Sequence, residues 1–437
     1  MQALVLLMLL GSGFVPSFVE NGWLPGVLTL FPEMISAAAT LLLLGVGVRT
    51  RFKDIDPAYV FGAAGLVLVM VFGAVANAVG SGPLISGARL TLRALPFFLI
   101  PAVYSFSEQQ VRRQLLALML VALVQLPIAV LQKRGEIYWG NTSGDFIEGT
   151  LGGSGTLSIF LISAACVLTA FFLRGRLSLS GWLVLLALCV APTTINETKA
   201  TFVLLPIGLV VTFWVAAERE RRLAGALSGA LSVVFLFGVL VPAYNFWAQA
   251  RDLNNQSGRT ITEFLTDPRA LEDYMNFDSG KEGALVGRGA AYRMTAQEVS
   301  REPVMTGLGL GLGNASVSRL GEGFTGRFGR KYVPVMQTSM IRFVLELGVL
   351  GAGLILLLHW RFYRDARSVA ADDPGFWGAL GAGWAGVTAV IVVAAFYADL
   401  LISPAIAYPF MYFTGVLAAH RVRHALGAQP VAGLVAT

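Results

Sequence analysis

The residues best suited to chemistry are basic side chains in a polar block that runs from about Arg251 to Val335. From Val286 onward this block holds seven Lys or Arg residues against three Glu residues. The basic residues are Arg288, Arg293, Arg301, Arg319, Arg327, Arg330 and Lys331. Guanidinium groups bind phosphate oxygens in pairs and keep their charge at low dielectric. This half of the block is therefore where an anionic partner would bind.

Two further groups of charged residues lie in mostly apolar sequence. Glu197 and Lys199 fall in a short polar stretch between two apolar runs, and their spacing lets them serve different partners. Arg89 and Arg93 are four residues apart, so they share one face of a helix. Because arginine is costly in lipid, we expect both to face the bundle interior or a wet cavity. The alternative is that the membrane-crossing segment that contains Arg89 and Arg93 starts later in the sequence, so that both side chains reach the outer surface of the membrane.

Other polar residues have simpler interpretations. The spacing of Arg342 and Glu346 favours an ion pair within one helix. Residues 133–153 are predicted to form a loop on the outer side of the membrane, and they include Glu136, Asp145 and Glu148. This loop is either a plain connection or the rim of a cavity.

Histidine and cysteine chemistry is not expected at the outer side. His359, His420 and His424 fall near the predicted cytoplasmic surface, which leaves neither a histidine metal cluster nor a Ser-His-Asp triad outside. Cys166 and Cys189 lie inside apolar runs and read as small core residues. We therefore expect no cofactor and no metal ion.

The composition predicts that the elements that position these residues belong to a membrane protein. Hydrophobic residues make up 56% of the chain and charged residues 13%, which excludes a soluble globule. About twelve apolar runs are long enough to cross roughly 30 Å of hydrocarbon. They lie near 2–18, 31–48, 58–79, 83–104, 114–132, 153–173, 180–196, 199–217, 223–247, 336–360, 375–397 and 404–420. The fold predicted is all-α, with one large loop between the ninth and tenth spans.

The orientation follows from the basic residues. Fifteen Lys and Arg residues fall in alternate short connections, whereas the connections near 19–30, 80–82 and 398–403 contain none. The positive-inside rule then places both termini in the cytoplasm. The chain divides into spans over 1–247, an extracytoplasmic loop domain over 248–335, and spans with a cytoplasmic tail over 336–437. The same rule accounts for the basic pI, so no nucleic-acid partner is expected.

Within the loop domain, residues 288–301 predict an amphipathic helix that ends at Pro303. Ala291, Met294 and Val299 are expected on its apolar side. The glycine run at 307–313 requires a flexible or tightly turned backbone. No strand precedes it, so it is not a dinucleotide-binding fingerprint.

This layout resembles the superfamily of O-antigen ligases and Wzy-type polysaccharide polymerases. One motif places an Arg four residues before an aromatic, then a Pro and a Gly-x-Gly-x-Gly run; the matching positions are Arg288, Tyr292, Pro303, Gly307, Gly309 and Gly311. A second opens a helix with a polar pair and carries E-L-G-x-x-G; here these are Gln337, Thr338, Glu346, Leu347, Gly348 and Gly351. A third, S-R-[GA], corresponds to Thr198, Lys199 and Ala200.

The departures favour a polymerase over a ligase. Gln337 stands where ligases carry a His, Lys199 replaces an Arg, and Asp145 and Glu148 lie where ligases tend to have an Arg. The resemblance implies transfer of a glycan from a polyprenyl-diphosphate carrier to a growing chain at the outer face of a bacterial inner membrane. Transfer to a lipid or protein acceptor, a transporter or flippase, and a non-catalytic subunit of an export complex remain alternatives.

The resemblance and the charge pattern together assign roles to eight residues. Arg288, Lys199 and Glu197 are the expected catalytic residues. Arg89, Arg93, Tyr292, Arg293 and Gln337 are expected to bind substrate. The expected partners are the lipid-linked glycan, membrane lipid and other polysaccharide assembly and export proteins.

Overall fold

A computed structural model describes residues 1–50, 52, 54–139, 147–218, 220, 222–252, 260–276, 286–318 and 320–425. Within these ranges every regular element is a helix, as predicted. The α-helices are α1 (Gln2–Glu20), α2 (Phe31–Thr50), α3 (Pro57–Ala76), α4 (Ser81–Leu92), α5 (Leu95–Val103), α6 (Glu108–Trp139), α7 (Ser154–Leu173), α8 (Leu179–Ile195), α9 (Thr201–Ala216), α10 (Arg222–Asp252), α11 (Ile261–Thr266), α12 (Pro268–Asn276), α13 (Arg288–Val299), α14 (Pro303–Leu308), α15 (Gly329–Tyr332), α16 (Ser339–Asp372), α17 (Phe376–Ala394) and α18 (Pro404–Ala425). Two residues named above, Asp145 and Arg319, fall outside the described residues. So do four of the fifteen basic residues that predict the orientation, namely Arg51, Lys53, Arg219 and Arg221.

All twelve apolar runs form helices, but the count of twelve spans is not confirmed. In the described part of the chain, eight helices are long and apolar enough to cross a membrane. A ninth span is possible if α4 and α5 are one broken span, since they meet at a bend of 51°. Pro96 lies at the start of α5 and cannot donate a helical hydrogen bond, which favours a break there. The helices α8 and α9 are apolar but shorter.

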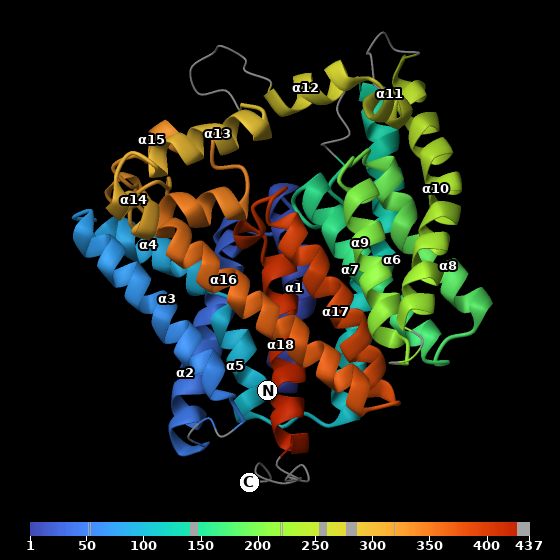
Figure 1. The fold of residues 1–437 in the computed structure, drawn as a ribbon, viewed down its shortest axis with the longest axis horizontal. Helices are drawn as coiled ribbons and strands as arrows, with labels where there is room; N and C mark the ends of the chain where they lie inside the picture. Colours follow the sequence, from blue (N-terminus) through green and yellow to red (C-terminus); the bar gives the residue numbers. More distant parts are fainter. Residues whose placement is uncertain are drawn as a thin grey trace.

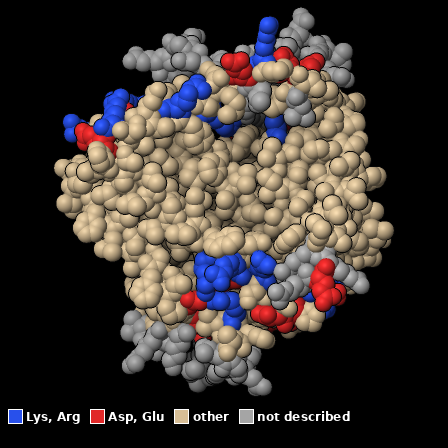
Figure 2. All heavy atoms as spheres, viewed as in Figure 1, with Lys and Arg blue, Asp and Glu red and all other residues tan. Residues whose placement is uncertain are grey.

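The charged residues separate the molecule into two ends. Lys, Arg, Asp and Glu atoms gather at opposite ends, and the band between them on the face shown in Figure 2 is formed by other residues. Figure 1 shows α11, α12, α13 and α15 at one end, which we call the loop end. The N-terminus and the last helix reach toward the other, which we call the terminal end. This arrangement is the one expected of a multi-pass membrane protein.

The helix bundle is packed around α7 and α17. Over an apolar stretch of 18 residues in each of these two helices, more than 70% of the residues are buried inside the protein, whereas in α10 the share is 11%. Small residues allow α17 to approach α7 and α9 closely. Gly386 of α17 lies against the backbone of Gly208 in α9, and Gly383 of α17 lies against the backbone of Val167 in α7. The helix α10 therefore packs at the edge of the bundle, mainly against α9.

The glycine run at 307–313 is a tightly packed turn. Gly309, Gly311 and Gly313 have φ values of 69°, 87° and 80°, a region that favours glycine. The turn meets α16 where Gly348, with φ of 66°, interrupts the helix. There the Leu310 N–H donates to the Leu345 carbonyl at 2.7 Å. The close approach of two backbones thus fixes the loop end onto α16.

This contact predicts different effects for two alanine substitutions in α16. In Gly348→Ala the new Cβ would lie 2.3 Å from the Gly307 carbonyl oxygen, at a positive φ. We expect a loss of about 2–4 kcal/mol in stability. Gly353 has no atom within 4 Å of such a Cβ, so Gly353→Ala should be neutral or stabilising by up to about 1 kcal/mol. Thermal unfolding of the two purified variants tests the contact, and equal shifts would contradict it.

Candidate functional site

The predicted amphipathic helix is present as α13, which begins at Arg288 and ends at Val299. Ala291 and Val299 are buried as expected, but Met294 is 45% exposed, so its predicted place on the apolar side is wrong. Thr295 and Glu298 occupy the buried face instead. Glu298 is satisfied there by Lys331 and Arg301, each at 3.2 Å. Pro303 opens α14 rather than lying at the end of α13.

The helix α13 presents Arg288 and Tyr292 to the connection between α17 and α18, residues 395–403. Arg288 donates from Nε to the Tyr397 carbonyl at 3.0 Å, and its guanidinium lies 4.1 Å from the centre of the Tyr397 ring. Tyr292 donates from its hydroxyl to the Phe396 carbonyl at 2.9 Å. Burial raises the pKa of Tyr292 against the opposing effects of the Thr338 hydroxyl and Arg288, so this hydroxyl stays protonated and can donate.

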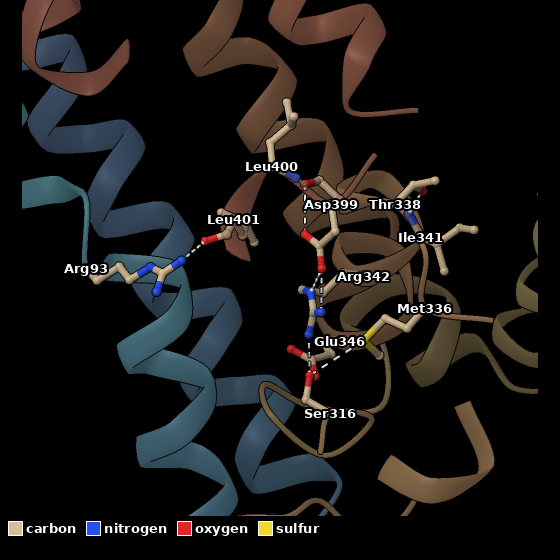
Figure 3. Close-up of polar contacts among 11 residues, drawn as sticks. Arg93, Ser316, Met336, Thr338, Ile341, Arg342, Glu346, Asp399, Leu400 and Leu401 are labelled. Atoms are coloured by element: carbon tan, nitrogen blue, oxygen red, sulfur yellow. Dashed lines mark hydrogen bonds and ion pairs between the residues drawn. The ribbon is translucent and has the colours of Figure 1, made fainter. Parts of the chain in front are cut away.

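The start of α16 holds the same α17–α18 connection from a second side. The Ser339 N–H donates to the Ala398 carbonyl at 3.1 Å, and the Ser339 hydroxyl donates to Asp399 at 3.1 Å. Arg342 donates from Nε to Asp399 at 2.9 Å and makes a second bond through Nη2 (Figure 3). Both side chains of this ion pair are at most 10% exposed. The connection is therefore fixed by a buried, charge-assisted contact.

The predicted ion pair between Arg342 and Glu346 is wrong. The carboxylate that Arg342 pairs with is Asp399, 57 residues away. Arg342 and Glu346 meet through Ser316, whose hydroxyl accepts from Arg342 and donates to Glu346 (Figure 3). Helical spacing made the local pair possible, but a closer acidic partner from another element takes its place.

Arg93 holds the α17–α18 connection from a third side. It donates to the Leu401 carbonyl, across from the Arg342–Asp399 pair (Figure 3). Arg89 and Arg93 also share one carboxylate, that of Glu33, at 3.3 Å and 3.5 Å. The Arg93 side chain is 9% exposed and the Arg89 side chain 29%. Arg93 thus faces the bundle interior, one of the two arrangements expected for this pair.

The residues between α8 and α9 form a second group at the loop end. Glu197 has a φ of 56° and pairs with Lys133 at 3.0 Å, with both side chains at most 7% exposed. The Glu197 carbonyl accepts from the hydroxyl of Tyr244 in α10 at 3.1 Å. Lys199 places its ammonium 4.9 Å from the centre of the Phe264 ring in α11. Lys133 lies in α6, which continues through Trp139, so the prediction that a loop begins at Lys133 is wrong.

The first turn of α7 lies between the Arg288 group and the Lys199 group. On one side Asn196 donates to the Ser154 carbonyl at 2.9 Å and to the Ser158 hydroxyl at 3.0 Å. On the other, a Cβ added at Gly155 would lie 3.7 Å from Cε1 of Tyr397. The first turn of α7 thus contacts a neighbour of Lys199 and the ring that Arg288 covers. A helix start with nearby cations favours an anion.

Two predicted substrate-binding residues make contacts within the protein. Arg293 is exposed and donates to Asn276 in α12 at 2.8 Å. Gln337 donates to the Val286 and Pro334 carbonyls, which fixes the chain just before Arg288. Both residues therefore position α13, and their proposed contact with substrate stays a prediction.

Three residues of this region were not expected from the sequence. Tyr397 lies at the end of the predicted span 375–397. Asp399 lies in the connection 398–403, which was noted only for its lack of basic residues. Lys133 was placed at the edge of a loop. The available signal was a basic residue directly after an apolar run, Lys133, and an acidic residue just after a span end, Asp399.

Comparison with known proteins adds no relative. No protein-family model matches the sequence, and no curated protein matches it either.

The candidate site is thus a set of basic side chains at the loop end, beside segments that contact the first turn of α7. Arg288 lies over the ring of Tyr397, which is beside Gly155, and Lys199 lies three residues after Asn196, which donates to Ser154. Glu197 is the acidic residue of the Lys199 group. Figure 2 shows basic atoms set into a hollow of the surface at this end. Among the described residues no group of three His, Cys, Asp or Glu side chains could hold a metal ion. The groups present suit electrostatic stabilisation of a phosphate or diphosphate.

Proposed function

We propose that the chain is a membrane glycosyltransferase that takes a glycan from a polyprenyl-diphosphate carrier and joins it to a growing polysaccharide. The observation that carries the proposal is the placement of Arg288 and Lys199 at the loop end of an apolar bundle, beside two segments that both contact the first turn of α7. A lipid-linked diphosphate would place its charged group at the loop end of the bundle while its polyprenyl tail stays in the membrane. Charged contacts at this place can therefore act on the leaving group directly.

The transfer requires one bond to form and one to break. An acceptor hydroxyl oxygen attacks the anomeric carbon, and the bond from that carbon to the diphosphate oxygen breaks. Arg288 and Lys199 stabilise the negative charge that develops on the diphosphate. Glu197, which pairs with Lys133, is the carboxylate that orients the acceptor hydroxyl and takes its proton. Polyprenyl diphosphate and the elongated glycan are the products.

Direct assay tests the reaction class. Purified protein in lipid would be incubated with short polyprenyl-diphosphate oligosaccharides. We expect longer lipid-linked glycans together with free polyprenyl diphosphate. A single transfer to a lipid or protein acceptor would indicate a ligase. Movement of intact donor across the bilayer, with no change in its bonds, would indicate a transporter.

The proposal places the loop end outside the cytoplasm of a bacterial cell. Ser300 at the loop end and Ser180 at the terminal end are both exposed, and Cys166 and Cys189 are both buried. In intact cells an impermeant thiol reagent should therefore label Ser300→Cys but not Ser180→Cys. Permeabilised cells should label both, which controls for reactivity. Labelling of Ser180→Cys alone in intact cells would reverse the orientation.

A further inference from the structure

Arg89, Arg93 and Glu33 form a cluster with unbalanced charge. Two guanidinium groups lie 3.3 Å and 3.5 Å from a single carboxylate oxygen of Glu33. Arg93 has one more acceptor, the Leu401 carbonyl, which is neutral. The nearby Asp399 is held by Arg342. The cluster therefore keeps one net positive charge.

Hydrogen bonding in this cluster is also incomplete. In the described part of the chain, the buried Nε atoms of Arg89 and Arg93 have no hydrogen-bond partner. Buried polar groups are almost always hydrogen-bonded, so these two unpartnered donors are where an acceptor would bind. The side chains of Arg89 and Glu33 are 29% and 24% exposed, so the cluster can be reached from outside. An anion is the partner that would satisfy both the charge and the donors.

The cluster is separate from the site around α7. It lies at the end of α4 and the first turn of α2, beside the 51° break between α4 and α5. Arg288 contacts the α17–α18 connection at Tyr397 and Arg93 contacts it at Leu401, four residues further on. The connection thus stands between two basic sites that both face the loop end.

We infer that Arg89 and Arg93 bind the diphosphate of a second carrier lipid, the one that anchors the acceptor glycan. This inference rests on the proposed function. A polymerase joins two glycans that are both lipid-linked, so it must hold two diphosphates in one membrane leaflet. Only the donor diphosphate leaves, and it would be held by Arg288 and Lys199. The acceptor diphosphate needs a cation that holds it without catalysis, and the arginine pair on Glu33 provides one.

Binding stoichiometry tests the inference. Polyprenyl diphosphate would be titrated into protein in phosphatidylcholine nanodiscs. The wild type should bind two equivalents, and Arg89→Gln should bind one with normal affinity and the other at least about tenfold more weakly. In the transfer assay, Arg89→Gln should raise KM for acceptor by a similar factor and leave KM for donor unchanged. Arg89→Lys should recover part of the loss, since it keeps the charge.

Glu33→Gln separates a binding role from a structural one. If the ion pairs only hold α2 against α4, then Glu33→Gln and Arg89→Gln should both impair the protein. If the cluster binds an anion, Glu33→Gln raises its positive charge and should retain or tighten the second equivalent. Arg112→Gln is the matched control, because Arg112 pairs with Glu108 at an exposed site of the terminal end. It should leave both equivalents intact.

Three results would overturn the inference. One is two equivalents of unchanged affinity in Arg89→Gln. Another is loss of binding in Glu33→Gln that equals the loss in Arg89→Gln. The third is competition by phosphatidylglycerol as effective as that by polyprenyl diphosphate, which would make the cluster a general headgroup site. Failure of the proposed function has a different signature, since the wild type would then bind no polyprenyl diphosphate and make no product.

Discussion

Replacement of Arg288 with alanine is expected to lower glycan transfer roughly 30- to 1000-fold, which corresponds to about 2–4 kcal/mol of transition-state stabilisation. Arg288 opens α13, where its charge adds to that of the free N–H groups of the helix start. Its guanidinium is already oriented by the carbonyl and ring of Tyr397. Little reorganisation is then needed when the diphosphate develops charge. Turnover and donor binding of the purified variant measure the effect.

Two further variants separate a specific role of Arg288 from the loss of one positive charge. Arg288→Lys should recover only part of the activity, because an ammonium lacks the planar fork that binds two oxygens. Arg301→Ala removes the same charge just after α13, from a side chain that is 63% exposed and paired with Glu298. It should change turnover by less than about threefold, in line with the small energies of exposed ion pairs. Normal turnover in a stably folded Arg288→Ala protein would remove Arg288 from the site.

The second large effect is expected from the buried pair of Lys133 and Glu197. Either Glu197→Gln or Lys133→Met leaves one buried charge without its principal partner, which costs about 3–5 kcal/mol of stability. The double variant removes both charges and should recover most of that loss. Thermal unfolding of the four proteins forms a complete double-mutant cycle.

Activity in the same cycle separates structure from catalysis. If Glu197 takes the acceptor proton, the double variant should be stable yet inactive. Recovery of both stability and activity would show that Glu197 only balances Lys133. The exposed pair of Arg112 and Glu108 serves as the control, and its cycle should give at most about 1 kcal/mol.

Periodicity and composition predicted much of the fold. Apolar runs identified every long helix, and residues 288–301 were correctly expected to contain a helix, which is α13. The glycine run was correctly expected to require unusual backbone angles. These features depend on residues close in sequence, which is why a single sequence reveals them.

The site depends on contacts between distant residues, and there the predictions failed. Nothing near Arg342 indicates that Asp399 rather than Glu346 would be its partner. Lys133 and Glu197 are 64 residues apart, and no helical period links them. The count of twelve spans is not confirmed, since α4 and α5 are bent apart, α8 and α9 are shorter than a full span, and α18 is not among the eight helices of the described chain that are long and apolar enough.

The α17–α18 connection makes the site robust to some genetic changes and fragile to others. Five of its backbone carbonyls, those of Ala395, Phe396, Tyr397, Ala398 and Leu401, accept hydrogen bonds from Arg93, α13 and α16. A carbonyl is the same whichever side chain its residue carries, so a substitution at Phe396 or Ala398 preserves these acceptors. Insertion or deletion of one residue would move all five out of register with their donors at once. Natural variants of this segment should therefore differ in composition while keeping its length.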